Sequence, residues 1–529
     1  MGITVPPAET AWLLHHVLGF DGMAESDTTA ILEEATRSAE GVFGPLDRDG
    51  DRIGSRLVDG EVLTPPGFRE AFRAYAEAGW IGISASPNHG GQGLPHVLAI
   101  AASEPIASAN LALSLCPMLT QDAIALLQTH GTEDQQARLM FPMIEGRWTG
   151  TMCLTEPQSG SDLSGVRARA VPAGDFGRIT GQKIFITWGE HGMSENILHM
   201  VLARLPDAPA GSAGISLFAV PKFLADGSRN AVRCLSLEEK LGIHASPTCV
   251  MEFSDALGEM VGPPHRGLAC MFAMMNAARL GVAMQGVAMA ERAFRRAADF
   301  AAQRVQGGGT IEKHPDVRRM LWAMRALALG GRLLTLHAAL HAESARGTLL
   351  IPVAKAWSTD AGVEAASFGV QVHGGMGFIE ETGAAQHLRD ARITPIYEGT
   401  NGIQALTLLH RGLLRDQGAA ATALLDEIEG EASVPHAVRR AAEAARGAID
   451  YLRHAEARAA DAGASPFLQL IGTLTAGWLC ARVSRHGAAP PAARAAAQVF
   501  LDQILPRVHA NAAALAAPTP ALIGGDLIA

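Results

Sequence analysis

Two short segments carry residue types and spacings that suit chemistry. The first, Ile396-Tyr397-Glu398-Gly399-Thr400-Asn401-Gly402, places a single carboxylate, Glu398, among small residues where a substrate can approach closely. The second, Leu154-Thr155-Glu156-Pro157-Gln158-Ser159-Gly160-Ser161-Asp162, is a turn rich in Gly, Ser and Thr. Its backbone N–H and hydroxyl groups could hold an electron-poor ring. The pair indicates a general base in one part of the chain and a ring-binding turn in another.

A carboxylate in such a turn suits the removal of a weakly acidic proton, for example from the carbon next to a thioester carbonyl. Desaturating the bond between the α- and β-carbons of such a thioester also requires a hydride acceptor. No side chain accepts a hydride, so a cofactor is needed. The sequence has no G-x-G-x-x-G after a predicted strand and no G-x-x-x-x-G-K-[ST]. A nicotinamide site of the Rossmann type is therefore not expected.

The two segments, in this order, resemble those of the acyl-CoA dehydrogenase flavoprotein family. The resemblance implies FAD as cofactor, an acyl-CoA substrate, Glu398 as the α-proton base and an electron-transferring flavoprotein as acceptor. It also implies that the thioester oxygen is bound by the Glu398 backbone N–H and a flavin ribityl hydroxyl. The competing interpretation is that Glu398 caps the helix expected from Thr400 onward.

The resemblance assigns the flavin site to several segments. Met152, Leu154 and Thr155 resemble the strand beside the isoalloxazine edge, and Phe185-Ile186-Thr187 resembles a Trp-Ile-Thr segment whose Thr lies near flavin N5. The segment Gln371-Val372-His373-Gly374-Gly375 resembles one that touches the pyrophosphate and adenosine of FAD. Arg304 resembles an Arg that pairs with this pyrophosphate across the subunit interface. Thr400 is also assigned to the cofactor. The chain departs from the family pattern at two places. It has Phe185 where Trp is usual, and Arg304 is not followed by the usual x-x-Phe-Gly continuation.

The same resemblance assigns Ser161 to the pantetheine arm and also to the cofactor side. Asn276 and Arg279, three residues apart on a predicted helix, resemble a pair near the CoA moiety and the base. Glu398 and Gly399 complete the substrate set. The alternative for Arg279 is a surface ion pair, and His373 is expected to be a structural or cofactor-adjacent histidine.

The elements that must position these residues change along the chain. Residues 66–145 have helical periodicity, short β-rich runs follow Gly150, and long Ala, Met and Leu stretches return after Gly267. We expect an α+β, mostly α chain with the acyl-CoA dehydrogenase fold. The expected domains are an N-terminal extension and helical domain (1–150), a middle β-barrel domain (151–262), a helical bundle (263–412) and an extra C-terminal helical domain (413–529). The whole pattern resembles the C-terminally extended branch that includes 3-methylmercaptopropionyl-CoA dehydrogenase.

Composition narrows the function classes. The chain has 529 residues, and its formal net charge of −10 argues against a nucleic-acid-binding surface. Its six cysteines are scattered without metal-ligand spacing, which favours buried thiols in a reduced, cytoplasmic protein with no metal site. No membrane insertion is expected, because the uncharged run 462–481 has polar residues and a one-faced apolar pattern typical of a buried helix.

Two rival functions stay open, and one assembly is expected. An acyl-CoA oxidase would pass electrons to oxygen, and a non-catalytic flavin-bearing scaffold would bind DNA through a basic C-terminal part. Residues 413–529 carry ten Arg against eleven Asp plus Glu, so no such basic surface is expected.

Amphipathic runs at Phe467–Trp478 and 499–505 need a partner surface. We expect this extension to cover the dimer–dimer face of the basic family, leaving a homodimer.

Overall fold

The computed structural model describes residues 2, 4–517, 522 and 524, and the chain forms two compact units. A helical unit contains residues 1–36, 96–108 and 279–529, and a sheet unit contains residues 37–95 and 109–278. The long helix α9 (Gly267–Gln303) begins in the sheet unit and continues into the helical unit. Residues near the N-terminus therefore join the C-terminal helices, which the linear division into domains does not anticipate.

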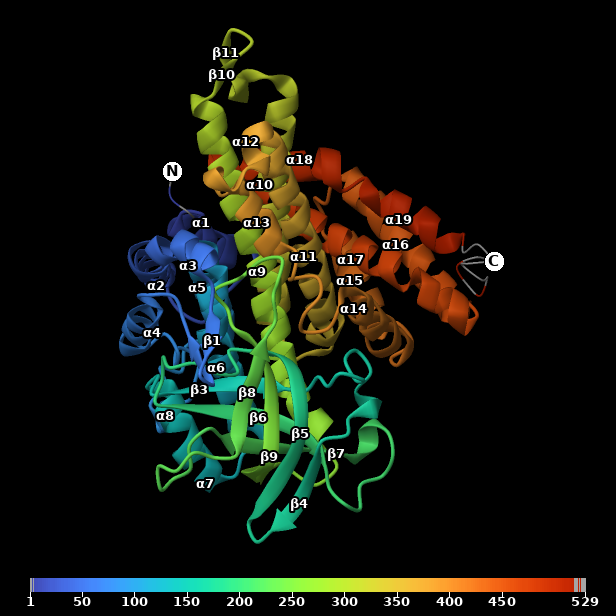
Figure 1. Ribbon diagram of the computed structural model, residues 1–529. Helices are drawn as coiled ribbons and strands as arrows, with labels where there is room; N and C mark the ends of the chain where they lie inside the picture. Colours follow the sequence, from blue (N-terminus) through green and yellow to red (C-terminus); the bar gives the residue numbers. More distant parts are fainter. Residues whose placement is uncertain (1, 3, 518–521, 523, 525–529) are drawn as a thin grey trace. The chain divides into compact units, whose positions relative to one another are not determined.

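The sheet unit is built around seven strands that follow the expected β-rich runs (Figure 1). The strand order is β3-β6-β4-β5-β9-β7, and β7 also pairs with β6, so that five of the strands close on themselves as in a barrel. The strands are β3 (Trp148–Cys153), β4 (Arg169–Ala173), β5 (Phe176–Thr187), β6 (Asn196–Arg204), β7 (Ile215–Pro221), β8 (Val232–Leu237) and β9 (Thr248–Val261). The expected middle β-barrel domain is thus present.

Helices in the sheet unit bury the apolar stripes that the periodicity predicts. Phe68, Phe72 and Tyr75 of α4 (Phe68–Glu77) are buried, as are Leu126 and Leu127 of another helix. The remaining elements are α3 (Asp47–Ile53), the hairpin β1 (Arg56–Val58) and β2 (Glu61–Leu63), α6 (Leu111–His130), α7 (Glu133–Gln135) and α8 (Phe141–Ile144). Gly150 of β3 lies against α6, where a Cβ would come within 2.5 Å of Ala123.

The helical unit centres on long helices whose Ala and Leu side chains allow close packing. Gly286 of α9 is in such tight contact with α11 that a Cβ would lie 2.3 Å from the Ser358 carbonyl oxygen. Its elements before residue 413 are α1 (Pro7–Trp12), α5 (His96–Ala109), α10 (Pro315–Leu340), α11 (Ala345–His373), α12 (Gly375–Phe378), α13 (Ala384–Ala391) and α14 (Asn401–Thr407), with α2 (Glu25–Ser38) ending at the unit boundary. A short hairpin of β10 (Val305–Gln306) and β11 (Gly309–Thr310) connects α9 to α10.

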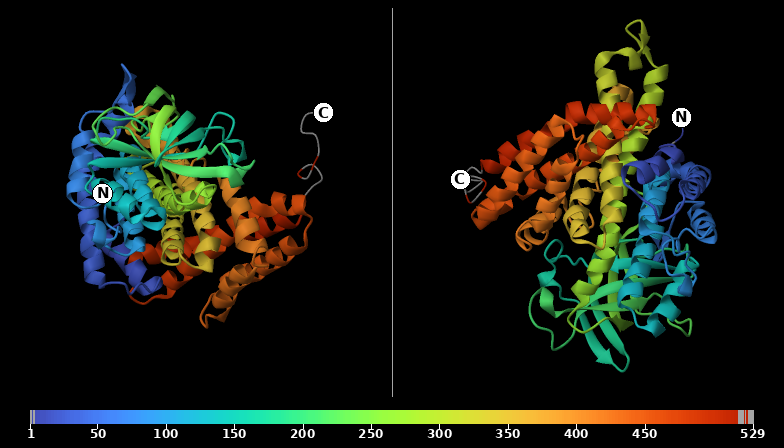
Figure 2. Two further views of the ribbon diagram at one scale, coloured as in Figure 1. Left: turned by 90° about the horizontal axis from the view of Figure 1, so that it is seen from below. Right: turned by 180° about the vertical axis from the view of Figure 1, so that it is seen from behind.

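The C-terminal extension is helical, as expected, and its apolar faces are covered within the helical unit. It contains α15 (Ala419–Gly430), α16 (His436–His454), α17 (Ala457–Arg485), α18 (Pro491–Val499) and α19 (Arg507–Ala516). The orange and red helices of this segment lie side by side in Figure 2. Phe467 and Trp478 of α17 are fully buried, and Phe500 packs against Gly330 of α10. The amphipathic runs therefore pack against α10 and α11.

A buried ion network ties the N-terminal segments to α9 and α10. Arg332 is fully buried and donates to both carboxylate oxygens of Glu104, at 2.8 and 2.6 Å, and to Glu291 at 3.0 Å. Arg325 bonds Glu291 at 2.6 Å and also pairs with Glu9. Burial alone would raise the pKa of Glu291, but the neighbouring arginine charges lower it to about 2. These charges explain why α1 and α5 belong with the C-terminal helices.

Other sequence expectations can be compared directly with the structure. All six cysteines are free and buried, as expected. Among the described residues, no group of three or more His, Cys, Asp or Glu could hold a metal ion. Helices Leu111–His130 and Gly267–Gln303 are long and apolar enough to cross a membrane, but 78% and 61% of their apolar windows are buried inside the protein. The run 462–481 lies within α17, a mostly buried bundle helix.

The ion network gives a stability prediction. Glu104→Gln removes one charge and leaves the fully buried Arg332 without its bidentate partner, which should cost about 3–5 kcal/mol. Because a chain with two units need not unfold in one step, we expect a clear fall in the thermal midpoint of the helical unit, measured by calorimetry. Asp316→Asn, which breaks the exposed Arg319 pair, is the matched control and should change little. Equal midpoints for both variants would contradict the assigned role of the network.

Candidate functional site

The turn that carries Glu398 has an unusual backbone. It follows α13 and Pro395, and the Asn401 N–H donates to the Pro395 carbonyl at 3.0 Å. Glu398 has φ 54° and Gly399 has φ 87°, so two successive residues lie in the left-handed region. For a residue with a Cβ, such a conformation costs about 1–3 kcal/mol and persists only where the surroundings enforce it. Glu398 is thus held in a position that its own backbone preference disfavours.

Helix capping does not explain Glu398. The N-cap of α14 is Thr400, whose hydroxyl accepts from the Ile403 N–H at 3.3 Å. The interpretation of Glu398 as the cap is therefore wrong. The Glu398 backbone N–H has no acceptor among the described residues. Its carboxylate and its N–H both remain available for a ligand.

Burial and nearby charges set the pKa of the Glu398 carboxylate. Partial burial raises the pKa of Glu398 to about 7, while the positive charges of Lys355 and Arg279 oppose this rise. Arg279 of α9 is only 4% exposed, so the interpretation of Arg279 as a surface ion-pair residue is wrong. Burial lowers the pKa of Arg279 to about 10, and Glu398 opposes that decrease. Glu398 therefore titrates near neutral pH, as a general base should.

Lys355 is a functional residue that the sequence analysis missed. It lies on α11, is fully buried, and donates to the Gly399 carbonyl at 2.9 Å and to Asn401 Oδ1 at 3.0 Å. Gln404 adds bonds to the Glu398 and Gly399 carbonyls at 3.2 and 3.1 Å. These donors hold the strained turn. The available signal was that Lys355 is the single charged residue in the apolar run 347–359.

A second group of expected residues lies elsewhere in the helical unit, where α9 and α11 end. The buried His373 bonds the Gly369 carbonyl at 2.7 Å and stacks on Phe300 at 4.3 Å between ring centroids, so it is structural, as expected. A Cβ at Gly374 or Gly375 would meet no atom within 4 Å. The exposed residues Gln371 and Arg304 complete this edge.

This edge presents groups that suit phosphate. The Arg304 guanidinium makes no hydrogen bond or ion pair with any other residue that the structure describes. The open backbone at the two glycines permits close approach of a ligand. The residues present therefore fit the pyrophosphate side of FAD, even though the usual Phe-Gly continuation after Arg304 is absent.

The turn that we expect to bind the flavin ring lies in the sheet unit. Met152 is in β3, which ends at Cys153. Leu154 and Thr155 follow the strand, so the strand expected to include all three residues ends two residues earlier. The Thr155 carbonyl accepts from the Ile184 N–H at 2.9 Å, which links the turn to β5. Ser161 lies exposed farther along the loop.

Glu156 within this turn has a structural role. Its carboxylate accepts from the backbone N–H groups of Arg167 and Ala168 at 2.7 and 3.0 Å. The fully buried Lys183 donates to Glu156 Oε1 at 2.8 Å and to the Leu154 carbonyl at 3.0 Å. The turn is fixed by a buried ion pair that sequence spacing did not reveal.

Phe185-Ile186-Thr187, at the end of β5, turns polar and aromatic groups outward. Phe185 is 58% exposed with φ 60°, Ile186 is buried and Thr187 is half-buried. A register shift in the pairing of β5 with β9 falls between Lys183 and Ile186, which breaks the regular alternation of faces. An exposed ring beside a hydroxyl fits the edge of a flat flavin ring.

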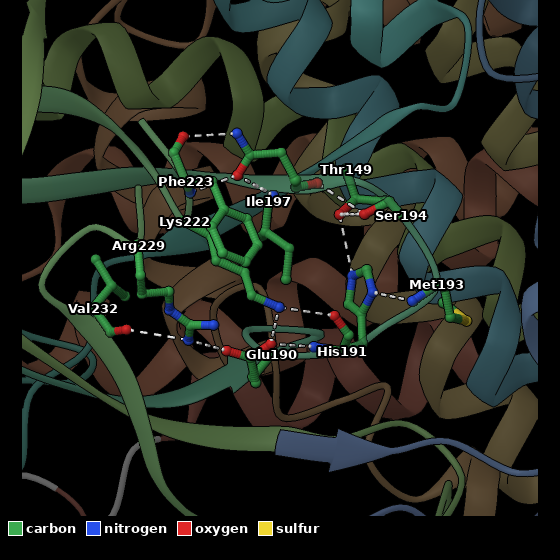
Figure 3. Close-up of polar contacts among 11 residues, drawn as sticks. Thr149, Glu190, His191, Met193, Ser194, Ile197, Lys222, Phe223, Arg229 and Val232 are labelled. Atoms are coloured by element: carbon green, nitrogen blue, oxygen red, sulfur yellow. Dashed lines mark hydrogen bonds and ion pairs between the residues drawn. The ribbon is translucent and has the colours of Figure 1, made fainter. Parts of the chain in front are cut away.

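Glu190 and His191, which follow this segment in the sequence, belong to the polar cluster drawn in Figure 3. Glu190, which is 2% exposed, pairs with Lys222 and with Arg229, the latter at 2.8 Å. His191 bonds the Thr149 hydroxyl through Nε2 at 3.1 Å and accepts from the Met193 N–H at 3.2 Å. Burial lowers the pKa of His191 to about 3, with Lys222 adding to the effect, so His191 is neutral and structural.

The structure brings the expected residues together in three sets. Arg279, Glu398, Gly399 and Thr400 lie together in the helical unit, and Arg304, Gln371, Gly374 and Gly375 form a second set there. Met152, Leu154, Thr155 and Phe185–Thr187 lie together in the sheet unit. Asn276 is exposed on α9.

Comparison with known proteins agrees with this geometry. Models of the N-terminal, middle and C-terminal domains of acyl-CoA dehydrogenase match residues 58–147, 151–256 and 265–413. The chain is 47% identical over 494 residues to 3-methylmercaptopropionyl-CoA dehydrogenase from Ruegeria pomeroyi, covering 85% of this chain and 84% of that protein.

Two solved structures share the fold over nearly the whole chain. Caenorhabditis elegans ACDH-11 in complex with C11-CoA matches with a TM-score of 0.81 and 22% identity over 96% of this chain and 92% of that one. A Bacillus anthracis acyl-CoA dehydrogenase complexed with FAD matches with a TM-score of 0.79 and 19% identity. The match covers 95% of this chain and 90% of that one. With three matching domain models and residues that suit the cofactor, the chain belongs to the acyl-CoA dehydrogenase family of FAD-dependent oxidoreductases.

Proposed function

We propose that the chain converts an acyl-CoA thioester to the trans-2-enoyl-CoA, with Glu398 as the base that removes the α-proton. The observation that carries this proposal is the Glu398 turn, where a carboxylate with a pKa near 7 stands beside a free backbone N–H. The base is matched to neutral pH, and the N–H can donate to a thioester oxygen as enolate charge develops.

The roles of the surrounding residues follow from their charges and contacts. Lys355 and Arg279 favour the ionised form of Glu398, so that a useful fraction is deprotonated at neutral pH. Bound FAD would accept the hydride from the β-carbon. Residues of the sheet unit, Met152, Leu154, Thr155 and Phe185–Thr187, would hold its ring. As the family resemblance implies, Arg304, Gln371, Gly374 and Gly375 would bind its pyrophosphate side across the subunit interface. Asn276, Arg279 and Ser161 are proposed contacts for the CoA part.

The acyl group is proposed to be short. The relative from Ruegeria pomeroyi is named for 3-methylmercaptopropionyl-CoA. Initial rates with 3-methylmercaptopropionyl-CoA, butyryl-CoA and longer or branched thioesters, using an artificial acceptor, test this assignment. A cytoplasmic location is also proposed, because the six buried thiols suit a reducing compartment.

The base has a direct test. Glu398→Gln keeps shape and hydrogen bonding but removes proton affinity, so FAD should stay bound while turnover falls about 10²–10⁴-fold. For the native protein, kcat/KM should rise with pH through about 7, because only ionised Glu398 accepts the proton. Glu77→Gln, which removes an exposed ion pair with Arg73 on one helix, is the control. It should leave the turnover rate and the pH dependence of kcat/KM unchanged. Native rates of flavin reduction in the Glu398 variant would remove the assignment.

The electron acceptor has a separate test. We propose an electron-transferring flavoprotein, so reduced enzyme should lose electrons quickly to that protein or to a dye and only slowly to oxygen. Hydrogen peroxide measured in air, against dye reduction without oxygen, separates dehydrogenase from oxidase. Peroxide formed as fast as the dye is reduced would instead favour the oxidase. A chain that binds FAD but turns over no thioester with any acceptor would be the non-catalytic scaffold.

A homodimer is proposed for the assembly. The short segment after Gly375 leaves Phe378 87% exposed and Ile379 48% exposed next to the pyrophosphate edge, which suits a subunit contact there. The C-terminal extension covers α10 and α11, which leaves less surface for further association. Light scattering should give twice the 55.4 kDa chain mass.

Deleting residues 413–529 should expose the apolar faces of α10 and α11 and give aggregates or a larger oligomer. The measurement is light scattering on the deletion variant beside the full-length protein. A tetramer of the full-length chain would contradict the covering role, and so would a soluble, active dimer after deletion.

A further inference from the structure

The C-terminal extension lies close to the catalytic turn as well as to the outside of the bundle. Helix α17 packs against α11 so tightly that a Cβ at Gly472 would meet the Trp357 ring at 2.6 Å. Trp357 Nε1 donates to the Thr473 hydroxyl at 3.0 Å. This contact fixes the position of α17 along the helix that carries Lys355.

One turn before Thr473, α17 contributes a polar side chain to the same interface. Gln469 is half-buried, and its amide donates to Asp360 Oδ2 at 2.7 Å. The other oxygen of Asp360 accepts from the Asn401 amide at 2.8 Å. Burial raises the pKa of Asp360, while these two donors and the charges of Lys355 and Arg392 oppose the rise. Gln469 is thus one of the groups that favour the ionised form of Asp360.

The same polar chain continues to the base. Asn401 Oδ1 accepts from Lys355 Nζ at 3.0 Å, and Lys355 Nζ also donates to the Gly399 carbonyl at 2.9 Å. A continuous series of short hydrogen bonds therefore runs from the extension to the strained turn. Its order is Gln469, Asp360, Asn401, Lys355 and Gly399, the neighbour of Glu398.

We infer that Gln469 of the C-terminal extension is a positioning residue that acts through Asp360, Asn401 and Lys355 on the turn carrying the proposed base Glu398. This inference rests on the proposed function. The extension thereby becomes part of the proton-transfer apparatus, in addition to covering the bundle.

Electrostatics gives the direction of the effect. Burial lowers the pKa of Lys355 to about 7, and the negative charges of Glu398 and Asp360 oppose this decrease while Arg279 adds to it. Without Gln469, Asp360 is more easily protonated, Lys355 is more easily neutral, and Glu398 loses a cation. The loss of that cation raises the pKa of Glu398. The charged groups facing this chain are Lys355, Asp360, Arg279, Arg392, Glu398 and, beside Arg279, Arg411.

Burial, Lys355 and Arg279 are the main causes of the shifted pKa of Glu398, whereas Asp360 acts on the pKa of Lys355. Loss of a nearby negative charge would otherwise lower the pKa of a carboxylate. An upward shift in an Asp360 variant must therefore pass through Lys355, which makes the sign of the shift diagnostic.

The test measures the pH dependence of kcat/KM for flavin reduction in the holoenzyme, using the best thioester from the substrate panel. Lys355→Met should move the midpoint upward by about 1–3 pH units, Asp360→Asn by about 1, and Gln469→Leu by a few tenths to about 1. Gln469→Asn, whose amide is one methylene too short to reach Asp360, should behave like Gln469→Leu and disturb folding less.

Thr473→Val is the matched control. It removes a different α17–α11 side-chain bond, to Trp357, without touching the series that leads to Glu398. It should lower the thermal midpoint about as much as Gln469→Leu and leave the pH midpoint at its native value. A double variant, Gln469→Leu with Lys355→Met, should shift the profile no further than Lys355→Met alone, since both act through one cation.

Three outcomes would overturn the inference: native pH midpoints in the Gln469 and Asp360 variants, a downward shift in Asp360→Asn, or an equal shift in Thr473→Val. The proposed function fails differently. If Glu398→Gln still reduces flavin at the native rate, Glu398 is not the base, whatever the Gln469 variants show.

Discussion

The left-handed backbone at Glu398 and Gly399 is the constraint on which the position of the proposed base depends. A residue with a Cβ does not stay in this region unless its neighbours hold it there. Here the carbonyl groups of the turn are bonded by Lys355 and Gln404, from two different helices. The result is a carboxylate and a backbone N–H that take no part in the helix cap, which Thr400 provides.

Buried lysines serve the same purpose in both units. Of the five lysines in the sequence, Lys183, Lys222 and Lys355 are buried, and they donate to the backbone carbonyls of Leu154, His191 and Gly399, respectively. A compact ammonium group with three donors can bond a carbonyl and a side-chain oxygen at once. The chain thus has few lysines, and these three have specific buried partners.

The arrangement also links stability to chemistry. Burying charges is costly unless each has partners, and the Glu104–Arg332–Glu291 network satisfies this condition by recruiting the N-terminal segments. The C-terminal extension does the same for Asp360 through Gln469. Segments at the two ends of the chain are therefore required by polar groups in the interior, in addition to covering apolar surface.

The sequence by itself determined the family, the three-part order of helices and strands, and the Glu398 turn, because these depend on local motifs and periodicity. It also predicted the buried cysteines and the buried helix at 462–481. Lys355, the Asp360–Gln469 bond and the sharing of the N-terminal segments with the C-terminal helices were decided only by the tertiary structure. They arise from partners 44 to 316 residues apart, whose meeting no spacing along the chain specifies.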